Sequence, residues 1–210
     1  MTPARDQKNI RGKLIIISGP SGVGKSTITR QLIERLDETY LSVSVTTRPQ
    51  APSERNGREY WFLSREQFHK RIAEGLFLEY AEVFGNLYGT PRDKTEEALN
   101  AGKTVILEID VQGAKQVKAI YPQATMIFIL PPSGKVLAER MGRRGRESGE
   151  VAARRLGGAG SEIAAAWQYY DHRVINDDLE QALSEVMQII KDAPRMDADS
   201  DTDQNNIGDR

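Results

Sequence analysis

A glycine-rich octapeptide near the start of the chain constrains the fold more than any other segment. It reads Gly19-Pro-Ser-Gly-Val-Gly-Lys-Ser26 and has the spacing G-x-x-x-x-G-K-[ST]. The apolar run Lys13–Ile17 before it predicts a buried strand, and Lys25–Leu36 after it has apolar residues on one helical face. Strand, glycine turn and helix in this order form a phosphate cradle, because the turn N–H groups and the positive helix N-terminus both face an anion.

This cradle predicts one substrate, a nucleoside triphosphate bound together with Mg²⁺. The Lys25 ammonium can reach the β- and γ-phosphates, and the Ser26 hydroxyl can ligate Mg²⁺. A glycine turn without chemical meaning is the alternative, but a chance match placed directly after a strand is rare. The octapeptide alone does not predict which group accepts the phosphate.

Strand-like and helix-like segments alternate along most of the chain, which predicts a parallel sheet covered on both faces. Segment 45–92 interrupts the alternation and is interpreted as an inserted unit. Strands are expected over Leu41–Val45, Tyr60–Leu63, Leu76–Val83, Thr104–Ile109, Thr125–Leu130 and Arg173–Ile175, with a turn-rich segment over Gly85–Pro91. Helices are expected from Ser64, as N-cap, to Glu74, and over Lys94–Asn100, Gly113–Ile120, Gly134–Met141, Glu150–Tyr170 and Leu179–Lys191.

Composition and charge exclude several classes of function. Lys and Arg number 29 against 30 Asp and Glu, so the chain has no overall basic field for nucleic acid or an anionic membrane. Cysteine is absent, which removes disulfides, thiol catalysis and Cys-ligated zinc and suits a reducing cytoplasm. The plain apolar run Met126–Leu130 is far shorter than the ~20 residues that a membrane span needs.

Charge is unevenly distributed along the chain. Residues 135–155 hold seven basic and three acidic side chains, whereas residues 193–210 hold five Asp and two Arg. Residues 1–11 and the acidic segment 193–210 are polar and poor in apolar residues, so we expect both ends to be disordered tails.

Several short motifs beyond the octapeptide resemble the guanylate kinase family, whose members move a phosphate from ATP to GMP. Each of these motifs is weak alone, but together they follow in the family's order with nearly gap-free spacing over about residues 13–190. They are Ser18–Thr27, Ser44-Val-Thr-Thr-Arg-Pro49, Asn56-Gly-Arg-Glu-Tyr60, Glu79 with Gly85-Asn-Leu-Tyr-Gly-Thr90, Leu107-Glu-Ile-Asp-Val-Gln-Gly113, Arg143-Arg-Gly-Arg146 and Asn176-Asp-Asp-Leu179.

The resemblance implies an α/β fold with a P-loop, doubly wound parallel sheet core over residues 12–192. It also implies a GMP-binding subdomain inserted at about 45–92 and a helical lid at about 133–160. The implied substrates are ATP with GMP or dGMP, with Mg²⁺ as cofactor. No nucleic acid or membrane partner is expected, and the oligomeric state stays open between monomer and homo-oligomer.

The resemblance also assigns the residues of the guanine site. Guanine offers an N1–H and an exocyclic amine as donors, so the Glu79 carboxylate is expected to accept from both, with Asp110 nearby. Ser44 and Thr90 are expected at the rim of the base. Adenine lacks the N1–H and would leave a buried carboxylate unpaired, and mismatches of this kind discriminate strongly. Without the resemblance, a solvated carboxylate and a turn hydroxyl are the better interpretations of Glu79 and Thr90.

The remaining site residues follow from the same resemblance. The GMP phosphate is expected on Arg48, Tyr60 and Tyr88, and the metal on Ser26, Glu108 and Asp110. The ATP site is expected to comprise Gly19, Pro20, Ser21, Gly22, Val23, Gly24, Lys25, Ser26, Thr27 and Asn176. The catalytic cations are expected to be Lys25, Arg48, Arg140, Arg144 and Arg155, which would stabilise charge on the transferring phosphoryl group.

The sequence departs from the family pattern at three places. Ala51 stands where the family has a second arginine, and Glu108 stands where it has an aspartate. Glycines at 157, 158 and 160 lie inside a predicted helix, where each costs up to ~1 kcal/mol. We hypothesise that Arg55 partly replaces the arginine missing at Ala51.

Two other functions are compatible with parts of the pattern. One is a guanylate-kinase-like module that binds proteins in the insert cleft, but such modules typically lose the phosphate loop, whereas Lys25 and Ser26 are present here. The other is a sister kinase for another phosphorylated acceptor, which would need no guanine-reading set such as Glu79, Ser44 and Thr90.

Overall fold

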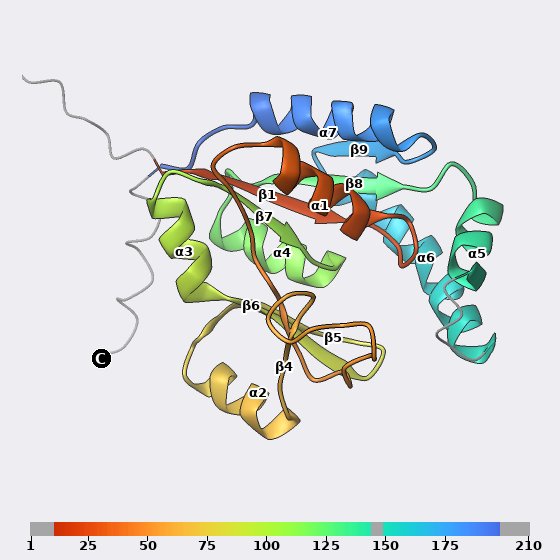
Figure 1. Ribbon diagram of the computed structural model, residues 1–210, viewed down its shortest axis with the longest axis horizontal. Helices are drawn as coiled ribbons and strands as arrows, with labels where there is room; N and C mark the ends of the chain where they lie inside the picture. The colour runs from red at the N-terminus through yellow and green to blue at the C-terminus, as the bar shows by residue number, and fades with distance from the viewer. Residues whose placement is uncertain (1–10, 144–148, 198–210) are drawn as a thin grey trace, which may run out of the picture.

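The computed structural model describes residues 11–143 and 149–197. Its centre is a five-stranded parallel sheet in the order β2-β7-β1-β8-β9 (Figure 1). The strands are β1 (Lys13–Ser18), β2 (Thr39–Leu41), β7 (Thr104–Glu108), β8 (Thr125–Leu130) and β9 (His172–Ile175). The parallel sheet predicted from the alternating segments is confirmed.

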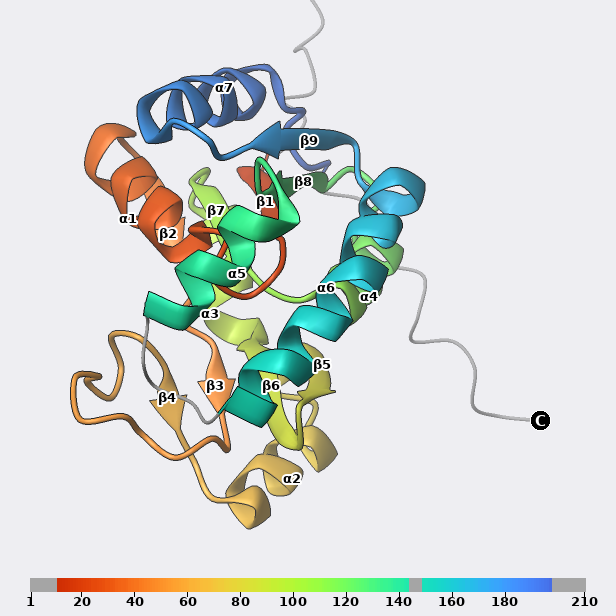
Figure 2. The ribbon, with the colours of Figure 1, turned by 90° about the vertical axis from the view of Figure 1, so that its right-hand side faces the viewer.

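Helices cover both faces of this sheet, because alternate residues of each buried strand point to opposite sides. In β1, Ile15 and Ile17 join one core cluster with α1 (Lys25–Arg35) and α7 (Leu179–Asp192). Leu14 and Ile16 join the other, with α3 (Arg92–Asn100) and α4 (Val111–Ile120). Figure 2 shows α1 and α7 on one side of β1 and β7, and α4 on the other.

A second, four-stranded sheet forms a separate layer in the order β4-β3-β6-β5, seen in the lower part of Figure 1. Its strands are β3 (Val45–Thr46), β4 (Trp61–Phe62), β5 (Phe77–Val83) and β6 (Asn86–Pro91). The α2 helix (Arg65–Ala73) packs Phe68 against this sheet, and its N-cap Ser64 forms the predicted capping box with Gln67. This sheet mixes parallel and antiparallel pairs and spans the segment that interrupts the alternation.

Two helices contain most of the basic residues of segment 135–155 and lie between β8 and β9 in the chain. The α5 helix (Gly134–Arg143) follows β8, and α6 (Gly149–Tyr169) leads back to β9. Leu137 of α5 and Ala166 of α6 are buried in the two clusters of the core sheet. Within the described ranges, no helix is both long enough and apolar enough to cross a membrane.

Two expected local structures are wrong, for identifiable reasons. The strand expected over Leu41–Val45 is divided, because Leu41 pairs with β7 in the core sheet and Val45 pairs with β6 in the second sheet. The turn-rich segment Gly85–Pro91 is mostly strand. The turn consists only of Phe84 and Gly85, both at positive φ, as in tight hairpins. Gly89, which suggested a turn, instead makes room for the stacked rings of Phe68 and Phe77.

The ends of the ordered body differ from the expected tails. Met196 is buried in the core, and its backbone exchanges hydrogen bonds with Arg11 and Gly12 at 3.1 and 2.9 Å. Arg11 is itself buried, and Asp197 is bonded to Gln123. The expectation of a disordered tail from residue 193 is therefore wrong for residues 193–197. The segment is polar on average, but its one large apolar residue, Met196, packs into the core. Residues 1–10 and 198–210 lie outside the described residues.

Candidate active site

The glycine-rich loop joins β1 to α1 at the carboxyl edge of the parallel sheet. Gly24 is the N-cap of α1 at φ 107°, a left-handed conformation that favours glycine. A side chain there would also collide with the Asn176 amide, which donates to the Val23 carbonyl at 2.8 Å. Arg140 of α5 donates to the Asn176 and Val23 carbonyls at 2.9 and 3.4 Å. The loop is thus braced by Asn176, expected at the ATP site, and by Arg140, expected as a catalytic cation.

Lys25 lies in the first turn of α1 and bends back over this loop. Its ammonium donates to the carbonyls of Gly19 and Pro20 at 2.5 and 3.2 Å. The backbone turn, the helix N-terminus and this ammonium therefore concentrate positive potential in one small region, as binding of a triphosphate requires.

Glu108 closes the other side of the phosphate region from the end of β7. Its carboxylate accepts from the Ser26 hydroxyl at 2.8 Å and from the Thr29 hydroxyl at 3.0 Å. Asp110, expected beside it as a metal ligand, is the N-cap of α4 and accepts from the Gln112 N–H at 2.6 Å; its role toward a metal stays a prediction.

The oxygen donors of Ser26 and Glu108 fit Mg²⁺, which prefers hard oxygen ligands and often takes only one or two from the protein. The described residues contain no group of three or more His, Asp or Glu that could hold a metal ion. A Mg²⁺ held by Ser26 and Glu108 would take its other ligands from water and nucleotide phosphates.

A buried carboxyl stands at the junction of the two sheets. Glu79 of β5 is 4% exposed, and the hydroxyl of its cross-strand neighbour Thr90 donates to it at 2.6 Å. Burial raises the pKa of Glu79 to about 7; the Thr90 hydrogen bond opposes the rise and the Asp110 charge adds to it. The other carboxylate oxygen lies against Gly113 of α4, where any larger side chain would collide with it.

A basic and aromatic cluster lies on the second sheet. The Arg48 guanidinium stands over the ring of Tyr60 at 5.4 Å, and the rings of Tyr60 and Tyr88 meet edge to face with centroids 5.9 Å apart. Burial raises the pKa of the Tyr60 phenol, and the Glu108 charge raises it further. Tyr60 therefore stays protonated and remains a hydrogen-bond donor at neutral pH.

Comparison with known proteins identifies the family behind this arrangement. Residues 11–193 match the guanylate kinase family. The chain belongs to the guanylate kinase family. It is 53% identical over 183 residues to a guanylate kinase of Thermosynechococcus vestitus, covering 87% of this chain and 94% of the relative. A guanylate kinase of Synechocystis is 48% identical over 187 residues, covering 89% of this chain and 97% of the relative.

A solved structure supports the same assignment at the level of the fold. The crystal structure of a guanylate kinase from Anaplasma phagocytophilum superposes with a TM-score of 0.74 at 34% identity, covering 87% of this chain and 86% of that one. The parallel sheet with a separate mixed sheet is thus the fold of the guanylate kinase family, as the sequence predicted.

The structure brings together most, but not all, of the guanylate kinase residues expected from sequence. Ser44 is partly exposed, and its carbonyl accepts from the Trp61 N–H at 2.9 Å. Arg144 and the side chain of Arg155 lie outside the described residues, so their roles stay predictions. Arg55 is exposed and its N–H donates to Glu59 at 2.7 Å, so its replacement of the missing arginine also stays a prediction.

Sequence reasoning missed two residues that contact this site. Thr29 follows Ser26 by one helical turn, a spacing that places both hydroxyls on one face and could have revealed the shared contact with Glu108. Glu54 pairs with Arg48 at 2.7 Å, and no spacing rule for an irregular loop would have indicated this.

Proposed function

We propose that this chain transfers the γ-phosphate of ATP to GMP and dGMP, producing ADP and the guanosine diphosphate, in guanine nucleotide metabolism of the cytoplasm. The observation that carries the proposal is the presence, in one chain of this family, of a P-loop and a buried carboxyl, Glu79, that can accept from guanine. The charge of Asp110 raises the pKa of Glu79, and Asp110 lies two residues after Glu108, which bonds Ser26 of the P-loop.

Guanine selection follows from the surroundings of Glu79. An ionised Glu79 accepts from the N1–H and the exocyclic amine of guanine, while the Thr90 hydroxyl satisfies its Oε1 from the side. Adenine presents no N1–H, so with adenine the buried carboxylate would lose this donor and keep only the Thr90 hydroxyl. Ser44 and Asp110 are proposed to complete the rim of this guanine site.

The acceptor phosphate is proposed to bind Arg48, Tyr60 and Tyr88. An arginine fork matches phosphate oxygens, and a neutral phenol adds a donor without adding charge. The Glu108 charge contributes to the raised pKa of Tyr60, and this supports a phosphate bound on this cluster in reach of the P-loop side. This placement would orient an acceptor oxygen toward the γ-phosphate. Such positioning is, together with charge stabilisation, the main contribution of a protein to phosphoryl transfer.

Transfer itself requires positive charge around the moving phosphoryl group. The N-terminus of α1 and Lys25 supply it from the loop, and Arg140 supplies it from α5 once phosphate competes with the carbonyls it now contacts. Arg144 and Arg155 are proposed to add to it. Mg²⁺, which Ser26 and Glu108 would hold, supplies further neutralisation of the β- and γ-oxygens when bound.

The test is a coupled assay with ATP, Mg²⁺ and each of GMP, dGMP, AMP, UMP and CMP. We expect turnover with the two guanine nucleotides and at least a hundredfold lower kcat/KM with the others. Equal use of AMP, or no phosphorylation of GMP by folded protein, would refute the proposal.

Lys25→Met tests the loop mechanism. The substitution keeps an apolar stem of similar length but removes a charge from the transition state, so we expect kcat to fall at least a hundredfold. Circular dichroism checks that the variant is folded, and near-normal turnover would exclude this role of Lys25.

A further inference from the structure

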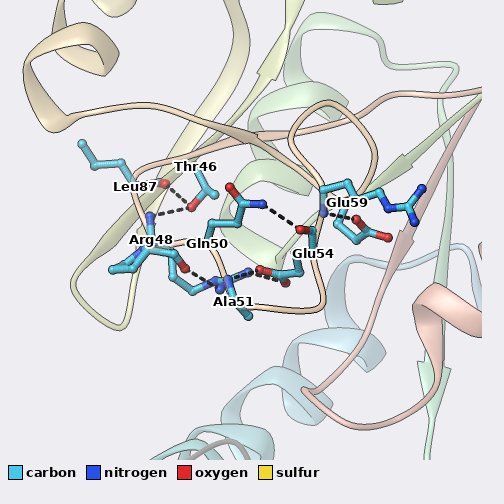
Figure 3. A network of polar contacts seen from close by, with 9 residues as sticks. Thr46, Arg48, Gln50, Ala51, Glu54, Glu59 and Leu87 are labelled. Atoms are coloured by element: carbon cyan, nitrogen blue, oxygen red, sulfur yellow. Dashed lines mark hydrogen bonds and ion pairs between the residues drawn. The ribbon is translucent and has the colours of Figure 1, made fainter.

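The loop between β3 and β4 is organised around one carboxylate, Glu54. Its Oε1 accepts from the Arg48 guanidinium at 2.7 Å, and its Oε2 accepts from the Ala51 N–H at 2.8 Å (Figure 3). Its side chain is only 10% exposed. Glu54 therefore joins the proposed acceptor-phosphate arginine to the backbone of the position where the family has a second arginine.

The loop fixes Glu54 independently of Arg48. The Glu54 N–H donates to the Ala51 carbonyl at 3.0 Å, and the Gln50 amide donates to the Glu54 carbonyl at 2.7 Å. With the contact to the Ala51 N–H, these bonds hold both the backbone and the carboxylate of Glu54 in place. A carboxylate held in this way can act as a fixed anchor for a mobile arginine side chain.

Arg48 is fixed by contacts of three kinds. Besides Glu54, its guanidinium donates to the Pro49 carbonyl at 2.8 Å and stands over the rings of Tyr60 and Phe62. Burial lowers the pKa of Arg48, but the hydrogen bonds and charges of Glu54 and, after it, Tyr88 together raise this pKa above its ordinary value. Tyr88, proposed above as a phosphate ligand, also interacts with this guanidinium. A guanidinium carries five N–H groups, so these contacts still leave donors for a phosphate.

We propose that Glu54 is a positioning residue for GMP, which holds the Arg48 fork in the orientation that receives the acceptor phosphate. The proposal rests on the proposed function above. The side chain of Ala51 can donate nothing to the phosphate, so the binding depends more on Arg48, and fixing Arg48 in advance reduces the entropy lost on binding. The opposing effect is repulsion between the Glu54 carboxylate and the phosphate, and the two effects predict opposite changes in the KM for GMP.

Glu54→Gln is the test, because the amide keeps the size of the side chain but can accept through only one of its two end atoms. We expect the KM for GMP to rise about tenfold, as one charge-assisted contact is lost. The KM for ATP should stay within about twofold. An unchanged or lower KM for GMP would overturn the proposal, and a lower one would identify Glu54 as a competitor of the phosphate.

Two controls separate positioning from general loosening of the loop. Glu59→Gln makes the same substitution in the same loop, where the carboxylate bonds the Arg55 N–H and pairs with Arg58 rather than Arg48. It should leave the KM for GMP unchanged, and an equal rise in both variants would overturn the proposal. In an Arg48→Lys background, which already lacks the fork, Glu54→Gln should add less than about twofold, whereas a full additional tenfold rise would show action independent of Arg48.

The activity of the wild-type protein with GMP distinguishes failure of the proposed function from failure of the positioning role. If it does not phosphorylate GMP, the proposed function fails. If it does and Glu54→Gln changes nothing, only the positioning role fails.

Discussion

At the scale of single residues, Glu79 shows how burial prepares a group for a ligand. The carboxyl lies between Thr90 and Gly113 at the meeting of the two sheets, and burial raises its pKa to about 7. Because the pKa of Glu79 is higher in the folded protein than in the unfolded chain, where it is near 4.5, the protonated carboxyl contributes its full stabilisation below pH 4.5. That contribution is lost as the pH rises through 7, because the folded state must then bury a charge.

Glu79→Gln tests this reasoning without ligand. The amide cannot ionise, so the variant should be more stable than wild type at pH 8 by on the order of 2–3 kcal/mol, and the difference should vanish toward pH 4.5. Thermal denaturation of both proteins across this pH range measures it. The same variant should lose kcat/KM for GMP and narrow the preference for GMP over AMP. A constant stability difference, or an unchanged GMP to AMP ratio, would contradict the assignment.

At the scale of elements, the segment after α7 is part of the core rather than a tail. Met196 lies 1% exposed in the same cluster as Leu14 and Tyr121, and it pairs through its backbone with the residues just before β1. This segment, residues 193–197, forms a strap at the start of β1, at the opposite end of the strand from the glycine-rich loop.

Two truncations measure the contribution of this strap. A chain ending at Asp197 should keep the wild-type free energy of unfolding, whereas a chain ending at Arg195 should lose about 2–4 kcal/mol of it, since the second truncation exposes apolar surface and breaks backbone hydrogen bonds. Chemical denaturation measures both. Because the strap is remote from the phosphate region, kcat/KM of the folded protein should stay within about twofold in each truncation, and a selective loss of activity would place the segment at the site.

At the scale of the whole molecule, the two nucleotides are expected to draw the parts together. The core sheet presents Lys25 and Arg140 on one side, and the second sheet presents Arg48 on the other. Figure 2 shows α6 extending toward the second sheet, and a side chain at Gly158 would lie 3.9 Å from the Phe84 ring in the β5–β6 turn. Two anionic substrates between these cations would favour a more closed arrangement, which also excludes water from the transfer.

Small-angle scattering tests this closure. With saturating GMP and a non-hydrolysable ATP analogue, the radius of gyration should decrease, and each nucleotide alone should produce a smaller decrease. Arg48→Lys should weaken the response to GMP but leave the response to the ATP analogue. An unchanged radius of gyration under saturation by both ligands would contradict closure.

The sequence by itself determined the features that local patterns encode. The glycine-rich spacing indicated the loop and the roles of Lys25 and Ser26, and apolar periodicity indicated the parallel sheet with its covering helices. The guanine and phosphate residues came from a resemblance. Taken singly, Glu79 and Thr90 are of types that are mostly exposed, and Tyr60 is of a type that commonly packs in a core or at its rim.

Only the tertiary structure decided what depends on neighbours distant in sequence. The burial that shifts the pKa of Glu79, the use of Asp110 as a helix cap and the pairing of Glu54 with Arg48 require positions in space. The same holds for Met196, whose burial depends on the strand at the other end of the chain, and for Gly89, which two aromatic rings cover. Local sequence sets backbone preference, but burial and partner choice are properties of the packed chain.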